Sequence, residues 1–289
     1  MPSRQQIKSR IRSVTSTKQI TRAMQLVSAS KLRRAQEAVQ GPRTYAEVAR
    51  EMLTHLREVA KSEGGHELFR VRPVKSRLII AIASDRSLAG AYNANIFRAV
   101  VQQLSDDRKA GVKTSVITIG RQVARSVARL KDVEAAGVYT DLPDKPETVS
   151  LRPILLSAFE KFTSGEVDDV TIIYTQFKST VTQQVTSQRI LPAGFTDVAL
   201  DKEVKTAEIE PSVEELIDVT VVRFLEAQLY QAYLEAAASE HAIRMLAMKN
   251  ATDNASDIIE DLTLEFNNAR QAAITQELSE ISAGVEALS

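Results

Sequence analysis

The residues best placed to do chemistry lie in one turn, Asp85-Arg86-Ser87-Leu88-Ala89-Gly90-Ala91, between a short apolar run and a helical pattern. In α/β proteins, loops that bind nucleotide phosphates lie at such a place. This turn has a single glycine, Gly90, where the dinucleotide fingerprint has three, and it lacks the Gly-Lys-Ser/Thr of a P-loop. We therefore favour a plain strand-to-helix turn, with a nucleotide-binding loop as the alternative.

Other catalytic or metal-binding patterns are missing from the sequence. It contains no cysteine, which excludes disulfides and thiolate metal sites. The three histidines, His55, His66 and His241, are far apart and show no metal-ligand spacing. Neither a nucleophile elbow nor an H-E-x-x-H motif occurs. The sequence therefore predicts no catalytic site, no metal and no cofactor of its own.

The formal net charge of zero hides an asymmetry between the two ends. Nine lysines and arginines and no acid precede Glu37, whereas fourteen acids and only four bases follow from Glu214 onward. The basic end and the acidic end are expected to attract each other, and this is favoured over binding of the basic end to an outside polyanion. A DNA-binding N-terminal arm is disfavoured because the helix lacks base-reading asparagine. The absence of tryptophan also disfavours a stacking platform for single-stranded nucleic acid.

Composition is that of an ordinary soluble protein, with 44% hydrophobic and 26% charged residues. No apolar run is long enough to span a bilayer. The N-terminal segment is basic and lacks the apolar core of a signal peptide. From the sequence we expect a cytosolic protein.

The first 60 residues read as one helix. Ile7, Ile11 and Val14, and then Ile20, Met24 and Val27, follow the four-then-three spacing of a coiled-coil seam. Ser3 and Gln6 fit a capping box at its start. The Gly41-Pro42 pair predicts a bend or break. The polar Lys18 and Thr21 are interpreted as seam positions that set the register or remain solvated.

The middle of the chain, residues 73–207, predicts an α/β domain with a Rossmann-like, mostly parallel sheet. Apolar runs at 77–84, 114–120 and 169–177 predict buried strands, and the alternation at 181–191 predicts a hairpin-linked fourth strand. Helical patterns cover 91–110, a short stretch that ends at Leu130, and 151–162. Alternating strands and helices are typical of this class.

Residues 211–289 predict a second long helix, with Ser212 as its N-cap. Its apolar residues recur at three- and four-residue steps and indicate one apolar stripe: Ile243, Leu246, Ile258, Leu262, Phe266, Ile274, Leu278, Ile281, Val285 and Leu288. The two terminal helices, roughly 85 Å and 115 Å long at 1.5 Å per residue, should pair as an antiparallel coiled coil. That pairing places Met24 near Met248 and Ile7 near Phe266.

The pairing leaves the second helix about 20 residues, or roughly 30 Å, longer than its partner. Small residues make this last part slim: Ala269, Ala272, Ala273, Ala283, Gly284 and Ala287. A lone helix with an apolar stripe is not stable in water. We therefore expect other chains to form a sleeve around it.

Two long stretches of the chain are distinctive: IKSRIRSVTSTKQITRAMQLVSASKLRRAQ near the start and AMKNATDNASDIIEDLTLEFNNARQAAITQELSEI near the end. Both resemble the corresponding ends of the gamma subunit family of rotary F-type ATP synthases. Length and the helix–α/β–helix order agree over the whole chain. One departure lies in the turn, where the family commonly reads D-R-G-L-C-G and this chain has Ser87 and Ala89. That departure puts a positive φ at position 87 in doubt.

The resemblance implies a non-catalytic rotor shaft. Its coiled coil would stand inside a ring of alternating alpha and beta subunits, and rotation of the proton-driven membrane c-ring would drive the catalytic sites through open, loose and tight states. The α/β domain would bind the epsilon subunit and rest on the c-ring. The complex would lie at the cytoplasmic face of a bacterial plasma membrane. The alternative is an autonomous nucleotide-binding α/β protein with coiled-coil dimerisation arms.

The resemblance also implies residues that meet the partner subunits. Lys18, Arg22 and Met24 would face the lever segments of beta. The other end of the chain would contribute a second set, in which Arg270, Gln271 and Thr275 meet beta-subunit loops and Leu288 turns in an apolar bearing.

Overall fold

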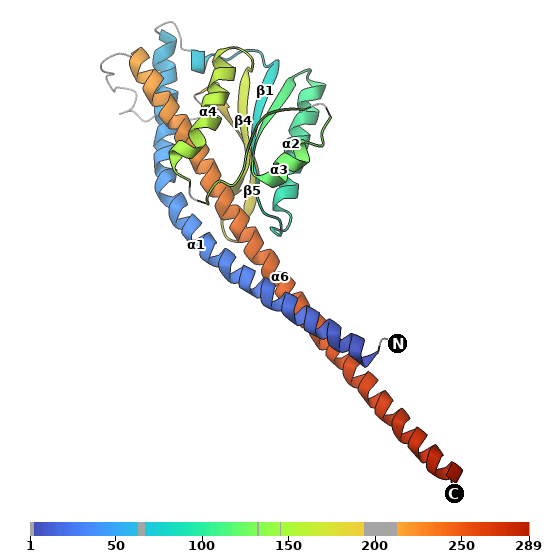
Figure 1. Ribbon diagram of the computed structural model, residues 1–289. Coiled ribbons are helices and arrows are strands. Elements are labelled where there is room, and N and C mark those ends of the chain that lie inside the picture. Colours follow the sequence, from blue (N-terminus) through green and yellow to red (C-terminus); the bar gives the residue numbers. More distant parts are fainter. Residues whose placement is uncertain (1–2, 63–66, 132, 145, 194–212, 289) are drawn as a thin grey trace. The chain divides into compact units, whose positions relative to one another are not determined.

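Two long terminal helices and a central sheet make up the chain (Figure 1). The computed structural model describes residues 3–62, 67–131, 133–144, 146–193 and 213–288, without some side chains near the ends of the long helices. Helix α1 covers Arg4–Ser62 and helix α6 covers Val213–Leu288. The chain divides into two units, Ala29–Ile243 and the pair Met1–Ser28 with Arg244–Ser289. We describe each unit by itself.

The larger unit contains a five-stranded sheet in the order β3-β2-β1-β4-β5. The strands are β1 (Ser76–Ile82), β2 (Lys113–Ile119), β3 (Glu134–Tyr139), β4 (Asp169–Phe177) and β5 (Gln183–Leu191). The first four strands run parallel, and β5 pairs antiparallel with β4 as the second arm of a hairpin. The predicted fold class, a mostly parallel α/β sheet with long terminal helices, is confirmed.

Helices cover both faces of this sheet. They are α2 (Tyr92–Lys109), α3 (Arg121–Val127) and α4 (Thr148–Thr163), with a short 3-10 helix, η1, at Glu67–Phe69. Alternate residues of β1 enter different cores: Leu78 and Ile80 pack in the core that includes α4 and α6, whereas Ile79 and Ala81 pack in the core that includes α2 and α3. Because both faces are buried, the strand reads as a continuous apolar run.

Strand β3 was missing from the sequence prediction. It lies at one edge of the sheet, pairs only with β2 among the described strands, and is partly exposed. Its residues EAAGVY contain two alanines and a glycine, so they form no apolar run that pattern analysis could detect. An edge strand is partly exposed to solvent and therefore needs fewer apolar residues than a central strand.

The first part of α6 belongs to the core of the α/β unit. Val221, Phe224, Leu225, Leu229 and Ala232 are buried in the same core as β1 and α4. Leu56 near the end of α1 joins this core as well. The sequence-based boundaries at 60, 73, 207 and 211 remain predictions, but both long helices contribute side chains to the interior of the central domain.

The smaller unit pairs the beginning of α1 with the end of α6. The hydroxyl of Thr252 donates a hydrogen bond of 2.8 Å to Oγ1 of Thr21, and both side chains are buried. In an antiparallel pair of helices, the numbers of facing residues add to a constant. For Thr21 and Thr252 this sum is 273, the same as for the predicted Ile7–Phe266 pair and one more than for Met24–Met248. The predicted antiparallel register is therefore confirmed at this point.

The start of α1 also follows the prediction. The backbone N–H of Gln6 donates to Oγ of Ser3 at 3.3 Å, and the Gln6 side chain accepts from the N–H of Ser3 at 2.9 Å. These reciprocal bonds are those of a capping box. They satisfy backbone donors that the helix leaves without partners at its N-terminus.

The predicted course of the α1 seam is wrong in its second half. Ile20 and Val27 are 58% and 57% exposed. The buried positions instead continue the heptads of Ile7 through Thr21, Ser28, Leu32, Ala35 and Val39. Four-then-three spacing counted from Ile7 reaches Thr21 and Ser28, and Ile20 and Val27 fall about 100° around the helix from them. A pattern of apolar residues could not locate the seam here, because the buried residues Thr21 and Ser28 are polar.

The single apolar stripe predicted for α6 is also wrong. Met248, Ala255 and Leu262 are buried, whereas Leu246 and Ile258 are about half exposed. The heptads from Met248 to Leu262 pass through Thr252 and Ala255, so small and polar residues again occupy the seam. Of the predicted stripe, Leu246 and Ile258 lie outside this seam and Leu262 lies in it.

Of the bend or break expected at Gly41-Pro42, the break does not occur, since α1 is continuous from Arg4 to Ser62, and the bend stays a prediction. A proline inside a helix loses one backbone hydrogen bond and clashes with the preceding turn. Leu32, Ala35 and Val39 are buried on one side of this point and Thr54 and Leu56 on the other. Tertiary packing on both sides therefore overrides the local preference.

The polar pair in the seam leads to a stability prediction. We expect Thr21→Val with Thr252→Val to raise the midpoint of thermal unfolding slightly, because both hydroxyls leave the interface together. Each single substitution should cost up to about 1 kcal/mol. Thermal unfolding of the four chains forms a double-mutant cycle. A double variant less stable than the sum of the singles would contradict this account.

Candidate functional site

The carboxylate of Asp85 anchors the turn of residues 85–91 to the neighbouring loops. Its Oδ1 accepts from the backbone N–H of Arg121 at 3.0 Å, and its Oδ2 accepts from the backbone N–H of Asp141 at 3.0 Å. Arg121 begins α3, and Asp141 follows β3. One side chain therefore ties the loops after β1, β2 and β3 together at the carboxyl edge of the sheet.

This geometry favours the plain turn over a nucleotide-binding loop. Nucleotide phosphates in α/β proteins bind to backbone N–H groups at the carboxyl edge. Here the carboxylate of Asp85, at the start of the turn, points to the loops after β2 and β3 and accepts two backbone N–H groups there. The backbone has positive φ at Leu88 and Gly90 and not at Ser87, so the departure at position 87 introduces no strain.

A second polar cluster lies toward the amino ends of the strands. The guanidinium of Arg77 contacts Asp107 at 2.5 Å and Asp169 at 2.9 Å, and Thr114 donates to Asp107 at 2.9 Å. Both carboxylates are almost fully buried. Paired and hydrogen-bonded in this way, they form a structural network that joins β1, β2, β4 and α2.

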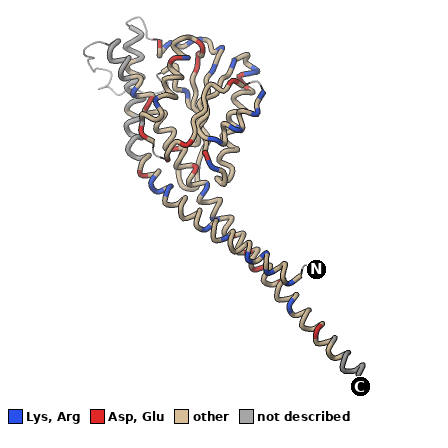
Figure 2. The backbone as a smooth tube through the Cα atoms, viewed as in Figure 1, with Lys and Arg blue, Asp and Glu red and all other residues tan. Residues whose placement is uncertain are grey.

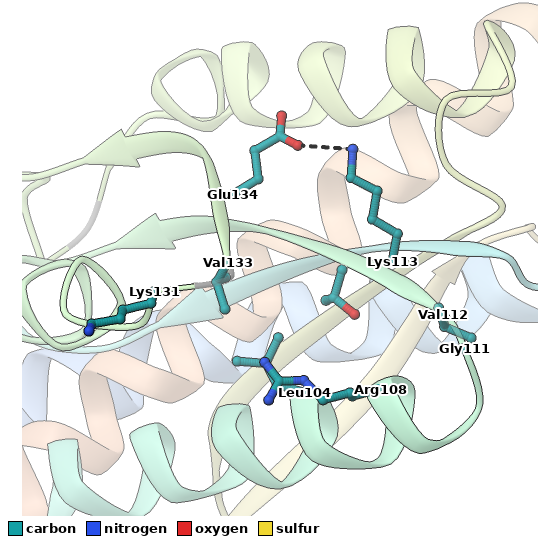
Figure 3. Close-up of a pocket in the computed structure, with 9 residues that line it drawn as sticks. Leu104, Arg108, Gly111, Val112, Lys113, Lys131, Val133 and Glu134 are labelled. Atoms are coloured by element: carbon teal, nitrogen blue, oxygen red, sulfur yellow. Dashed lines mark ion pairs between the residues drawn. The ribbon is translucent and has the colours of Figure 1, made fainter.

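A hollow of about 640 Å³ lies beside this network, between the end of α2 and the starts of β2 and β3 (Figure 3). Arg108, Lys113 and Lys131 line it, and Glu134 pairs with Lys113 at 3.5 Å. The ion pair is largely solvent-exposed. The hollow lies at the opposite end of the strands from the edge where α/β proteins bind ligands.

The predicted partner-contact residues form two separate sets. Lys18 and Met24 are half-buried on α1, and Arg22 is exposed, with Nη1 donating to Gln25 at 3.4 Å. Arg270, Gln271 and Thr275 are all exposed on α6. In the register of the Thr21–Thr252 bond, Arg22 and Met24 lie beside residues 249–251, about 20 residues or roughly 30 Å from Arg270 along α6.

The structure therefore does not bring the two predicted sets together. The hydroxyl of Thr275 donates to the carbonyl of Gln271 at 3.0 Å, so its hydrogen is used within its own helix. The side chain of Leu288 lies outside the described part of the chain, and its predicted contact stays a prediction.

The end of α6 carries a row of exposed apolar side chains. In the register of the Thr21–Thr252 bond, Arg4 at the start of α1 lies beside position 269, whereas α6 continues to Leu288, 19 positions further (288 − 269) (Figure 1). Ile274, Leu278 and Ile281 in that extension are 46%, 60% and 65% exposed. Their four-then-three spacing places them on one face. This row is the strongest candidate interaction site on the chain.

Charge is sparse around this row (Figure 2). From Ile274 to Ile281 the charged residues are Glu277 and Glu280. Sequence reasoning found these apolar residues but assigned them to the same stripe as Leu262. The structure separates them, because Leu262 is buried whereas the row is exposed.

The expected pairing of the basic and acidic ends stays a prediction. Among the described ion pairs, Lys31 contacts Asp144 at 2.8 Å and Arg33 contacts Glu37 at 3.4 Å. Neither acid belongs to the acidic C-terminal part. Within the described residues, no three histidines or carboxylates gather as metal ligands would, and none of the helices is both long and apolar enough to cross a membrane.

A family model and the curated relatives agree on one family, and the matches extend over nearly the whole chain. A family model described as ATP synthase matches residues 3–288. The ATP synthase gamma chain of Chloroflexus aurantiacus is 42% identical over 290 residues, which span 100% of this chain and 99% of the relative. The ATP synthase gamma chain of Macrococcus caseolyticus is 38% identical over 289 residues and is covered completely, as is this chain.

Solved structures share the fold at lower sequence identity. A chain of the central stalk and c-ring of Tetrahymena thermophila mitochondrial ATP synthase gives a TM-score of 0.61 at 24% identity, over 80% of this chain and 99% of the other. A rotor chain of Euglena gracilis mitochondrial ATP synthase gives 0.64 at 17% identity, over 93% of this chain and 97% of the other.

Proposed function

The chain belongs to the ATP synthase gamma-chain family, and we propose on that basis that it is the central rotor shaft of a proton-translocating ATP synthase. In this role the chain couples rotation of a membrane c-ring to conformational change at catalytic beta subunits. An asymmetric shaft acts by differential contact, since it favours a different state in each beta subunit at each angle.

The observation that carries this proposal is the exposed apolar row on the last part of α6. Ile274, Leu278 and Ile281 are exposed in the isolated chain and follow the end of its pairing with α1. An isolated helix of this length is marginal in water unless its apolar face is covered. A ring of alternating alpha and beta subunits would cover it on all sides, and the small residues Ala269, Ala272 and Ala273 keep the helix slim.

The proposal assigns separate tasks to the two sets of contact residues. Lys18, Arg22 and Met24 face the lever segments of beta, and Arg270, Gln271 and Thr275 meet beta-subunit loops nearer the tip. The separation of roughly 20 to 30 Å between them supports contacts at two heights along the shaft. A rotor must not lock at one angle, and sparse contacts serve that need better than deep hot spots.

The remaining parts of the proposal concern location and chemistry. The α/β domain binds the epsilon subunit and rests on the c-ring, at the cytoplasmic face of the membrane. Nucleotide hydrolysis and synthesis take place on beta, and this chain supplies no catalytic group. The structural role of Asp85, whose two carboxylate oxygens accept backbone N–H groups of the neighbouring loops, supports that division.

Native mass spectrometry of the complex purified through a tag on this chain tests the proposal. We expect one copy of this chain with alpha, beta and epsilon subunits and a ring of c subunits. Recovery of the chain only as a free monomer or homodimer, together with tight stoichiometric binding of ATP or NAD in calorimetry, would establish the autonomous nucleotide-binding alternative instead.

A triple substitution examines the exposed row itself. Ile274→Glu, Leu278→Glu and Ile281→Glu together should leave thermal unfolding of the isolated chain within about 0.5 kcal/mol of the wild type, because these side chains are exposed there. Recovery of the chain with alpha and beta should fall sharply, because carboxylates would enter an apolar bearing. Val149→Glu, Leu156→Glu and Val181→Glu on the α/β domain are the matched control, also at exposed apolar positions.

A further inference from the structure

One carboxylate links the two long helices to the α/β domain. Nζ of Lys31 on α1 lies 2.8 Å from Oδ2 of Asp144, and Nε2 of His241 on α6 lies 3.1 Å from Oδ1 of the same residue. Asp144 lies between β3 and α4. Each oxygen of this single side chain therefore contacts a different helix, and the two helices come from opposite ends of the sequence.

The environment favours the ionised form of Asp144. The contacts with His241, and secondly with Lys31, hold the pKa of Asp144 well below its usual range. His241 is only 2% exposed, whereas Lys31 and Asp144 are 42% and 49% exposed. Removal of the Asp144 carboxylate would take this contact from the buried imidazole, which is costly because the ring stays away from water.

The same segment binds α6 a second time. The hydroxyl of Tyr233 lies 3.3 Å from the carbonyl oxygen of Leu142 and 3.0 Å from that of Pro143, to which it donates. Burial raises the pKa of this hydroxyl, so it remains a donor. Residues 142–144 thus hold two positions of α6, Tyr233 and His241, eight residues apart.

Further buried bonds fix the same stretch of α6. The hydroxyl of Ser239 donates to the carbonyl of Thr175 at 3.0 Å, and the hydroxyl of Tyr92 donates to the carbonyl of Ala236 at 3.2 Å. Apolar contact between α6 and the sheet is non-directional and tolerates sliding. Directional hydrogen bonds and ion pairs do not. The polar contacts therefore set the angle and height of α6 on the domain.

The contacts of Asp144 lie close to the limits of the α/β unit on both long helices. The α/β unit ends at Ala29 on α1 and at Ile243 on α6, and Lys31 and His241 lie two residues inside those limits. The Asp144 contacts therefore occur at the last points where each helix belongs to the α/β unit. Torque on the domain can therefore enter both helices at these contacts, as well as through the apolar core around α6.

We propose that Asp144 is a positioning residue that fixes α1 and α6 to the α/β domain, so that rotation of the domain turns both helices together. The proposal rests on the rotor function proposed above. In its absence the apolar core still holds α6 to the domain, but α1 loses its ion pair to the 142–144 segment. Part of each rotary step is then lost as movement of one helix against the domain.

The test compares Asp144→Asn and Asp144→Ala with Asp141→Asn in the complete complex reconstituted into vesicles. Asp141 lies three residues earlier, and its side chain pairs with Arg121 within the α/β domain, so it touches neither long helix in the described contacts. Its φ of 60° is one that asparagine adopts readily. We measure ATP hydrolysis, and protons pumped per ATP against an opposing gradient.

We expect Asp144→Ala to lower protons pumped per ATP about threefold at unchanged ATP hydrolysis. Asp144→Asn should show a smaller loss, and Asp141→Asn none. Adding Lys31→Ala to Asp144→Ala should cause no further loss, because both changes remove the same contact. Wild-type coupling in Asp144→Ala, or a full additional loss from Lys31→Ala, overturns the proposal.

Two controls separate this proposal from the rotor function and from simple destabilisation. If the wild-type chain assembles and couples but Asp144→Ala behaves identically, only the positioning role fails; if the wild-type chain joins no ATPase, the rotor function fails. In the isolated full chain, backbone amides of 29–39 and 236–243 should exchange about tenfold faster in Asp144→Ala than in Asp141→Asn. Uniformly faster exchange over the whole α/β unit would mean lost stability and overturn a specific positioning role.

Discussion

Replacing Met24 by lysine is expected to lower ATP-driven proton pumping by the complex about tenfold while ATP hydrolysis changes less than about twofold. Met24 is half-buried on α1, on the face that also exposes Ile20 and Val27. An added ammonium there would, by the proposed contacts, stand close to the lever segments of beta. A bound cation would hold one rotor angle more tightly than the others, so hydrolysis continues but drives rotation poorly.

The controls for this prediction separate charge from packing. Met24→Leu keeps an apolar side chain of similar volume and should couple normally. Gln19→Lys adds the same charge at an exposed position that lies on neither the seam nor the Ile20–Val27 face, and it too should couple normally. Equal losses from Gln19→Lys and Met24→Lys would show that general charge causes the effect. Unchanged coupling in Met24→Lys would reject the contact and leave the fold assignment intact.

Replacing Gly120 by valine is expected to destabilise the α/β unit by more than about 4 kcal/mol. Gly120 has φ of 100°, and a Cβ atom built on it would lie 2.3 Å from the carbonyl oxygen of Ala83. The obstructing atom belongs to the backbone just after β1. Here the N–H of Ala83 donates to the carbonyl of Ile119, and the N–H of Gly120 donates to the carbonyl of Tyr139. No side-chain rotation relieves such an overlap, so strands β1, β2 and β3 must separate locally.

Gly111→Ala provides the matched control for this prediction. Gly111 also has positive φ, 72°, but nothing lies within 4 Å of a Cβ built there. It should therefore lose only about 1 kcal/mol, the cost of a left-handed backbone for alanine. Thermal unfolding and soluble yield of both variants give the comparison. Similar losses in the two variants would show that the steric account of Gly120 is incorrect.

The sequence predicted those elements whose local signals agree with their packing. Ser3 and Gln6 form a capping box because the whole motif lies within one turn. The strand at β1 was visible because both of its faces are buried, and the antiparallel register followed from helix rise alone. Each of these depends on periodicity or on short-range bonding.

The failures have the opposite origin. The seam positions Thr21 and Ser28 are polar, and their hydroxyls donate to carbonyls of their own helix, to Lys18 and Met24 respectively, so apolar periodicity pointed to Ile20 and Val27 instead. Strand β3 is short, edge-located and rich in small residues. The Asp144 contacts join residues 113 and 97 positions apart, and no local pattern reports on such distances.

The seam of the paired helices has one mechanical consequence. The hydroxyls of Thr21, Ser28 and Thr252 each have a carbonyl of their own helix within hydrogen-bonding distance, at 3.0, 2.8 and 2.8 Å. A small axial slip of one helix along the other breaks the Thr21–Thr252 bond but leaves no hydroxyl unsatisfied, and it opens no large cavity because the side chains are small. At these three positions the seam therefore offers less resistance to a small axial displacement than interlocking large side chains would.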